Sequence, residues 1–190
     1  VIDLDGRMVG IVTFDDAMDV MVDEATEDIT KMAAINPSEK TYFETSILQH
    51  AKNRIPWLLI LMFTSIITGT IITRYENAFA AIPLLVSFIP MLMDTGGNAG
   101  GQASVTIIRG LSLNEIEFKD AFKVVWKEAR VAVLCGLTLA AANFVKLLLF
   151  DRVTIAVAAV VCLTLVAAVF IAKIIGCLLP MLAKKIGFDP

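Results

Sequence analysis

The chain has 190 residues, of which 57% are hydrophobic and 18% charged, and its mean hydropathy is +0.78. This composition is typical of a polytopic membrane protein and excludes an ordinary soluble domain. The net charge of −3 conceals an acidic segment, residues 1–30, in which Arg7 is the only basic residue. An acidic segment joined to an apolar body argues against nucleic acid as a partner.

Residues 1–30 begin with the pattern strand, turn, strand, helix. Residues 1–4 and 8–13 alternate as strands do, Asp5-Gly6 is a turn signal, and Thr13 before two aspartates predicts a helix N-cap. The pattern is similar to the end of a CBS domain, so we expect an N-terminal remnant of an α/β regulatory domain. Since the chain begins within a strand-like pattern and not with Met, we expect a part of a longer protein.

Acidic residues continue along the predicted helix. Asp15, Asp19 and Asp23 recur every four residues, which places like charges on one helix face, where they repel each other. Two interpretations are open: a solvated face, or a weak divalent-cation sensor whose ions neutralise the repulsion. The candidate regulatory ligands are Asp16, Asp19, Asp23, Glu24, Glu27 and Asp28.

A connecting segment, residues 31–54, leads from this region to the apolar body. Asn36-Pro37-Ser38 breaks the chain, and residues 41–53 have the pattern of an amphipathic helix that ends in basic residues. The residues alone predict an interfacial helix at the membrane edge.

Residues 55–190 contain candidate membrane spans at about 55–73, 78–108, 131–149 and 153–182. Each has at least about the 20 residues that a bilayer requires. The second span is long and carries Pro83 and Pro90, so we expect a kink or break near Pro90. Broken helices are where membrane proteins build ion sites, because freed carbonyl groups can face a cavity.

Basic residues flank these spans unevenly. Lys52, Arg54, the basic residues within 109–130 and Lys184-Lys185 fall on one side of the membrane, and Arg74 and Arg152 on the other. By the positive-inside rule we expect a multi-pass protein of the cell (inner) membrane with a cytoplasmic N-terminal region. For Lys173, deep in the last span, pairing with a carboxylate and contact with lipid headgroups are both open.

The most unusual stretch is residues 91–102, where polar residues and glycines interrupt an apolar run. In a helix, Asp94, Asn98 and Gln102 would lie at i, i+4 and i+8 along one stripe. An ionisable residue at membrane depth indicates function, and a lining of oxygen ligands suits Mg²⁺ or Ca²⁺. The glycines fit either helix packing or the approach of a hydrated ion. The candidate pore residues are Asp94, Thr95, Gly97, Asn98 and Gln102.

Residues 90–115, PMLMDTGGNAGGQASVTIIRGLSLNE, resemble the MgtE family of magnesium channels and transporters. The resemblance implies an all-α polytopic membrane domain with its pore at a homodimer interface. It also implies that the connecting segment is a plug helix, and that Mg²⁺ held by the acidic region locks the pore shut. Family members continue into a fifth span that carries another pore aspartate, so we expect an incomplete ion site within these residues.

The leading hypothesis is a Mg²⁺ channel or transporter gated by cytosolic Mg²⁺, with Mg²⁺ as both cargo and regulator. The alternative is an ion-coupled secondary transporter of divalent cations that uses Asp94 as a relay. An enzyme has little support, because the sequence offers no nucleophile–base pair, HExxH motif or phosphate loop. An anion channel would require helix N-termini or basic residues in the pore rather than Asp94.

Overall fold

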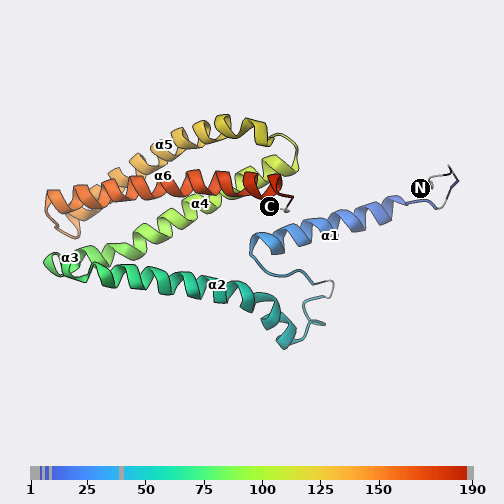
Figure 1. Cartoon of the computed structure of the whole chain (residues 1–190), viewed down its shortest axis with the longest axis horizontal. Coiled ribbons are helices and arrows are strands. Elements are labelled where there is room, and N and C mark those ends of the chain that lie inside the picture. Colours follow the sequence, from blue (N-terminus) through green and yellow to red (C-terminus); the bar gives the residue numbers. More distant parts are fainter. Residues whose placement is uncertain (1–4, 6, 9, 39–40, 188–190) are drawn as a thin grey trace. The chain divides into compact units, whose positions relative to one another are not determined.

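The structure is a computed structural model that describes residues 5, 7–8, 10–38 and 41–187. Every regular element in these residues is a helix (Figure 1). The chain divides into two compact units, Val1–Arg74 and Tyr75–Pro190. The fold is therefore all-α in its described part, as expected for the membrane domain.

The first unit begins with α1, Phe14–Met32. The predicted N-cap is confirmed, since the Thr13 side chain accepts from the Asp16 backbone N–H, and the Asp16 carboxylate accepts from the Thr13 N–H. Residues 10–13, part of the second expected strand, form no strand, and residues 1–4 lie outside the described residues. A strand exists only when its backbone pairs with a neighbour, so the sequence pattern alone was not sufficient there.

The second helix, α2, runs from Ile47 to Arg74 and joins two segments that the sequence pattern separates. Residues 47–53 of the amphipathic helix expected over 41–53 form the start of α2, whereas residues 41–46 form a turn in which Thr41 Oγ1 donates to Glu44 Oε2 at 2.8 Å. Pro56, which stands at the start of the predicted span 55–73, lies inside α2. A proline removes one backbone hydrogen bond without ending a helix whose other residues favour it.

The second unit contains α3 (Glu76–Ala81), the 3₁₀ helices η1 (Pro83–Phe88) and η2 (Phe118–Asp120), and three long helices. These are α4 (Ile89–Ser112), α5 (Ala121–Leu149) and α6 (Ile155–Lys185). The predicted break near Pro90 is present, but it extends back to Pro83, so the expected span 78–108 is not continuous. Pro83 and Pro90 stand at helix starts, where a missing N–H leaves no bond unmade.

Three helices in the described chain are long and apolar enough to cross a membrane: α2, the segment Phe118–Leu149 containing α5, and α6. They correspond to the first, third and fourth predicted spans. The helix α4 is not among them, because its glycines and polar residues lower its hydropathy. It is nevertheless 24 residues long, which is about 36 Å of helix and enough to cross a bilayer.

Helix α6 lies against both α4 and α5, and it runs in the same direction as α4. The backbones of α4 and α6 approach most closely at Gly100 and Gly176. A Cβ atom at Gly176 would overlap the Gly100 carbonyl oxygen, and one at Gly100 would lie 3.1 Å from the Ala172 carbonyl oxygen. Small residues at four-residue intervals permit such close packing between membrane helices.

The α4–α6 contact continues to the ends of the two helices. Ile107 and Leu111 of α4 pack with Cys177 and Met181 of α6 in one buried cluster. At the end of α6, Lys184 Nζ donates to the Leu111 carbonyl at 2.6 Å, in addition to the Asn114 N–H at 3.3 Å, and it thereby ties the end of α6 to the end of α4.

The close approach of α4 and α6 at Gly176 predicts that Gly176→Ala destabilises the protein. The added methyl group meets backbone, which cannot rotate away, so we expect a loss of about 1–3 kcal/mol of stability. Thermal unfolding of the full-length protein in detergent measures this loss. Gly69→Ala in α2 is the matched control, because its added Cβ meets no atom within 4 Å. Equal melting temperatures for the two variants would contradict the packing role of Gly176.

Candidate functional site

The central motif is helical, as the stripe of polar residues requires. Residues 91–102 lie within α4, so Asp94, Asn98 and Gln102 follow one another along one helix face. This face is exposed in the isolated chain, while Gly96, Ala99 and Ala103 on the opposite face are buried. The α4–α6 contact therefore leaves the polar stripe uncovered.

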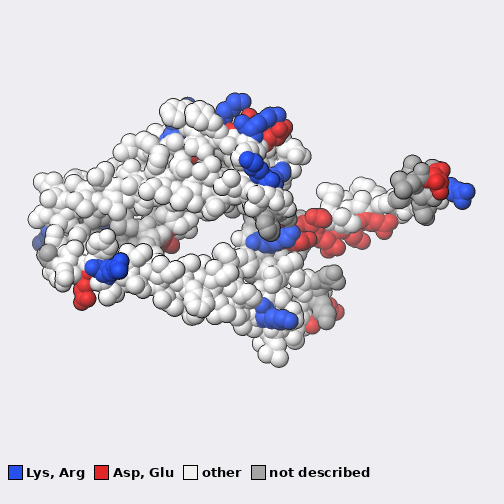
Figure 2. All heavy atoms as spheres, viewed as in Figure 1, with Lys and Arg blue, Asp and Glu red and all other residues white. Residues whose placement is uncertain are grey.

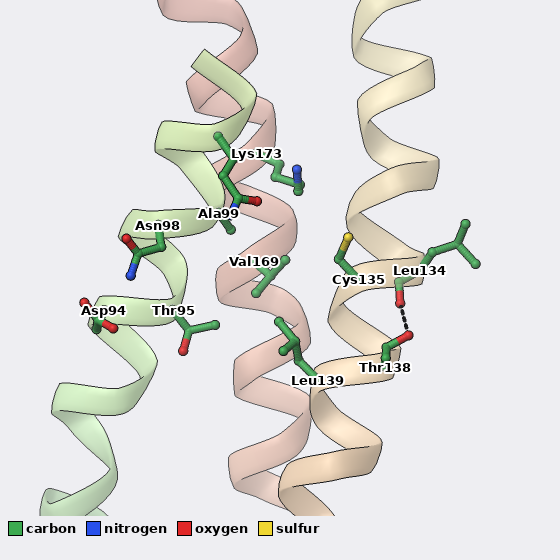
Figure 3. A pocket seen from close by; sticks show the side chains of 11 residues that line it. Asp94, Thr95, Asn98, Ala99, Leu134, Cys135, Thr138, Leu139, Val169 and Lys173 are labelled. Atoms are coloured by element: carbon green, nitrogen blue, oxygen red, sulfur yellow. Dashed lines mark hydrogen bonds between the residues drawn. The ribbon is translucent and has the colours of Figure 1, made fainter. Parts of the chain in front are cut away.

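A groove of about 540 Å³ lies between α4 and α5, with α6 contributing its floor (Figure 3). Figure 3 shows Thr95 directed toward this space, whereas Asp94 and Asn98 lie at its rim on α4. The lining residues are Asp94, Thr95, Asn98, Ala99 and Gln102 of α4, Leu134, Cys135, Thr138 and Leu139 of α5, and Val169 and Lys173 of α6. Four of the five candidate pore residues thus share one groove.

The fifth candidate, Gly97, borders a second groove of about 540 Å³ on the neighbouring side of α4. Asn98 and Gln102 line both grooves, and Gly101 lines the second with Gly97. A Cβ atom at either Gly97 or Gly101 would meet nothing within 4 Å. The glycines of the motif are therefore of two kinds: Gly96 and Gly100 pack against α6, and Gly97 and Gly101 leave an open strip of backbone.

A buried ion pair stands beside the first groove, and the sequence did not reveal it. Lys173 of α6 is 6% exposed, and its Nζ lies 3.6 Å from Glu128 Oε2 of α5. That oxygen is buried and has no hydrogen-bond partner among the described residues. Of the two interpretations open for Lys173, the structure therefore supports pairing with a carboxylate. The depth of Lys173 was visible in the sequence, but nothing there identified Glu128 as its partner.

The candidate regulatory residues lie along α1, and Figure 2 shows a red row of acidic residues on this helix. Two of the regulatory candidates have partners of their own. Glu27 pairs with Lys31 at 2.8 Å, and Asp16 accepts from the Thr13 hydroxyl at 2.6 Å. These hydrogen bonds from Thr13 lower the pKa of Asp16 below its ordinary value of 3.8. Asp16 therefore stays ionised and helps to hold the start of α1.

In the described part of the chain, no three His, Cys, Asp or Glu side chains converge to hold a metal ion. Asp19, Asp23 and Glu24 all lie on exposed positions of α1, as does Asp28. Carboxylates spaced along one helix bind a divalent cation only weakly unless further ligands approach from elsewhere. The structure therefore places these candidates on one exposed helix but does not bring them into one site.

Comparison with known proteins identifies relatives along the entire chain. A family model described as "MgtE: Divalent cation transporter" matches residues 89–190, which include the polar stripe, the groove and the Lys173–Glu128 pair. The magnesium transporter MgtE of Thermus thermophilus is 38% identical over 190 residues, and that of Bacillus subtilis 31% identical. Enterococcus faecalis has a third, 31% identical.

Each of these matches covers the whole chain but only 41–42% of the relative. The chain thus spans about two fifths of the length of the curated relatives it matches. All three relatives are named as transporters, and none of the names describes an enzyme.

Proposed function

Because the chain belongs to the MgtE family of divalent cation transporters, we propose that the full-length protein carries Mg²⁺ across a membrane along a path bordered by α4. One observation supports this most directly: α4 exposes Asp94, Asn98 and Gln102 on a face that α5 and α6 do not cover. Such a face is costly against lipid, so it requires either water or another protein surface.

The chemistry of the stripe suits a hydrated magnesium ion. Mg²⁺ dehydrates reluctantly and is usually held by one or two carboxylates while it keeps several waters. In our proposal, Asp94 supplies the negative charge, and the side-chain oxygens of Thr95, Asn98 and Gln102 bind the ion's waters. The open backbone at Gly97 leaves room for that water shell.

The path is completed by a second copy of the chain in this proposal. One chain forms grooves that open on two sides of the stripe rather than a closed pore. A homodimer with a two-fold axis beside α4 would bring two Asp94 side chains to one path and would cover both grooves. Other divalent cations with oxygen ligands, such as Mn²⁺ or Co²⁺, could follow the same path.

The charge distribution supports an orientation in the inner membrane with the N-terminal region in the cytoplasm. In the second unit, the end formed by the C-termini of α4 and α6 and the start of α5 is basic (Figure 2). It carries Arg109, Lys119, Lys123, Lys127, Lys184 and Lys185. The opposite end has fewer basic residues: Lys146, which pairs with Asp151 at 2.5 Å, and Arg152. Cytoplasmic loops carry the excess of basic residues.

We further propose that the acidic residues of α1 sense cytosolic Mg²⁺. Like charges four residues apart repel each other, and a divalent cation removes this repulsion. Because these residues do not form a complete site within the described chain, other segments of the full-length protein or of its partner copy would supply the remaining ligands.

An ion-coupled secondary transporter is the alternative, with Asp94 as a proton or Na⁺ relay. The interruption of the chain at Pro83–Phe88 before α4 favours this reading as much as a channel, since transporters also build ion sites at broken helices. Flux into proteoliposomes separates the two, because flux through a channel follows the Mg²⁺ potential and persists when the proton or Na⁺ gradient is collapsed.

Removing the charge of Asp94 tests the path. We expect Asp94→Asn to reduce Mg²⁺ uptake by the full-length protein in proteoliposomes at least about tenfold, since an amide retains the shape but not the attraction for a divalent ion. Glu115→Gln, a charge removed from an exposed loop, is the control and should transport normally. Normal uptake by Asp94→Asn would exclude Asp94 from the path.

Neutralising Asp16, Asp19 and Asp23 together tests the sensor. We expect the triple Asp→Asn variant to require several-fold more internal Mg²⁺ for inhibition, while its preference for Mg²⁺ over other cations stays unchanged. The measurement is the dose response of flux to internal Mg²⁺. Glu76→Gln, an exposed carboxylate outside α1, controls for a general loss of charge. An unshifted dose response would place the sensor elsewhere.

A further inference from the structure

The groove lined by the polar stripe of α4 also contains a positively charged side chain. Lys173 contributes to the floor of this groove, and Figure 3 shows its ammonium group directed toward α5 rather than toward α4. It stands 12 residues before the end of α6, about 18 Å along the helix, so it lies too deep for easy escape to the interface. Its charge is compensated inside the protein by Glu128 at 3.6 Å.

Lys173 is close enough to the polar stripe of α4 for its charge to affect the binding of a cation there. Gly100 of α4 contacts Ala172, the residue before Lys173, and Asp94 lies six residues before Gly100. At 1.5 Å per residue, the levels of Asp94 and Lys173 differ by about 9 Å along α4, and the spacing of about 8–10 Å between packed helices adds to this offset. At a separation of about 13 Å and an effective dielectric constant near 20, an uncompensated positive charge still lowers the occupancy of a divalent cation at least about tenfold.

We propose that Glu128 is a positioning residue for transport: it neutralises Lys173 so that the groove remains attractive to a divalent cation. This inference rests on the proposed path along α4. Glu128 does not line the groove and need not touch the ion. It acts through Lys173, and the pair sets the electrostatic potential of the groove opposite Asp94.

Because of the setting of Glu128 Oε2, removing Lys173 and removing Glu128 should have different effects on cation affinity. This oxygen is buried and has no hydrogen-bond partner among the described residues, and it faces Lys173 at a distance longer than a good hydrogen bond. When Lys173 is removed, this carboxylate either keeps its charge and attracts cations or takes up a proton and becomes neutral, and in neither case does it repel them. Loss of the glutamate charge should therefore lower cation affinity, whereas loss of the lysine charge should not. A pair that served only to join α5 to α6 would impair transport in the same direction whichever partner was lost.

The test compares variants of the full-length protein with and without a fixed positive charge at position 173. In the Glu128→Gln background, a lysine can lose its proton, but an arginine cannot. We expect E128Q/K173R to transport Mg²⁺ at least about tenfold more slowly than E128Q/K173M. Proteoliposome flux is the readout, normalised to the folded protein that each preparation contains. Equal flux in the two double variants would overturn the proposal.

A single variant gives a second, independent arm. K173Q leaves Glu128 either ionised, which adds attraction for a cation, or protonated, which keeps the pair neutral, so its apparent KM for Mg²⁺ should not rise above that of the wild type. This arm decides alone if E128Q/K173R does not fold, because a raised KM in K173Q would overturn the proposal. Asp94→Asn is measured in the same assay. If it transports normally, the path itself is wrong; if it fails while charge at position 173 has no effect, only the role of Glu128 is wrong.

Discussion

The crossing of α4 over α6 is the contact on which the candidate site depends. Gly100 and Gly176 bring the two backbones together, and the residues of α4 that face α6 are small or apolar. The remaining face must then carry Asp94, Asn98 and Gln102 without a partner from α5 or α6. A charged residue at the centre of a membrane helix costs about 2.5–3.5 kcal/mol on insertion scales. That cost is avoided when the stripe meets water, a hydrated ion or a second copy of the chain.

Away from the basic end of the second unit, several charged residues have definable settings. Asp94 lies on the exposed stripe, Lys146 and Asp151 pair at the end of α5, and Lys173 pairs with Glu128 between α5 and α6. The first groove thus has a carboxylate on one wall and a compensated ammonium on its floor. This arrangement favours a cation in the groove and disfavours an anion, provided that Glu128 keeps the lysine neutralised.

Much of the fold was predictable because long apolar runs in the sequence indicate membrane helices. The third and fourth spans, the break before α4, the cap at Thr13 and the helical stripe of α4 all followed from local patterns. The continuity of α2 through Pro56 did not, since a proline in a long helix is compatible with both a start and an interior position. Nor did the partner of Lys173 or the two kinds of glycine in the motif. The two kinds of glycine depend on which face of α4 meets α6, which is fixed by packing between segments some 70 residues apart. The Lys173–Glu128 pair depends in the same way on how α5 packs against α6.

The most direct test of the account is whether the groove beside α4 holds water and Mg²⁺. Thr95→Cys in a full-length protein whose Cys135, Cys162 and Cys177 are replaced by Ala would be treated with a cationic, water-soluble thiol reagent. The account predicts rapid modification at Thr95→Cys, slowed by Mg²⁺, and slow, Mg²⁺-independent modification at Leu163→Cys on the exposed apolar side of α6. Equal, slow rates at the two positions, indifferent to Mg²⁺, would contradict a cation path along α4.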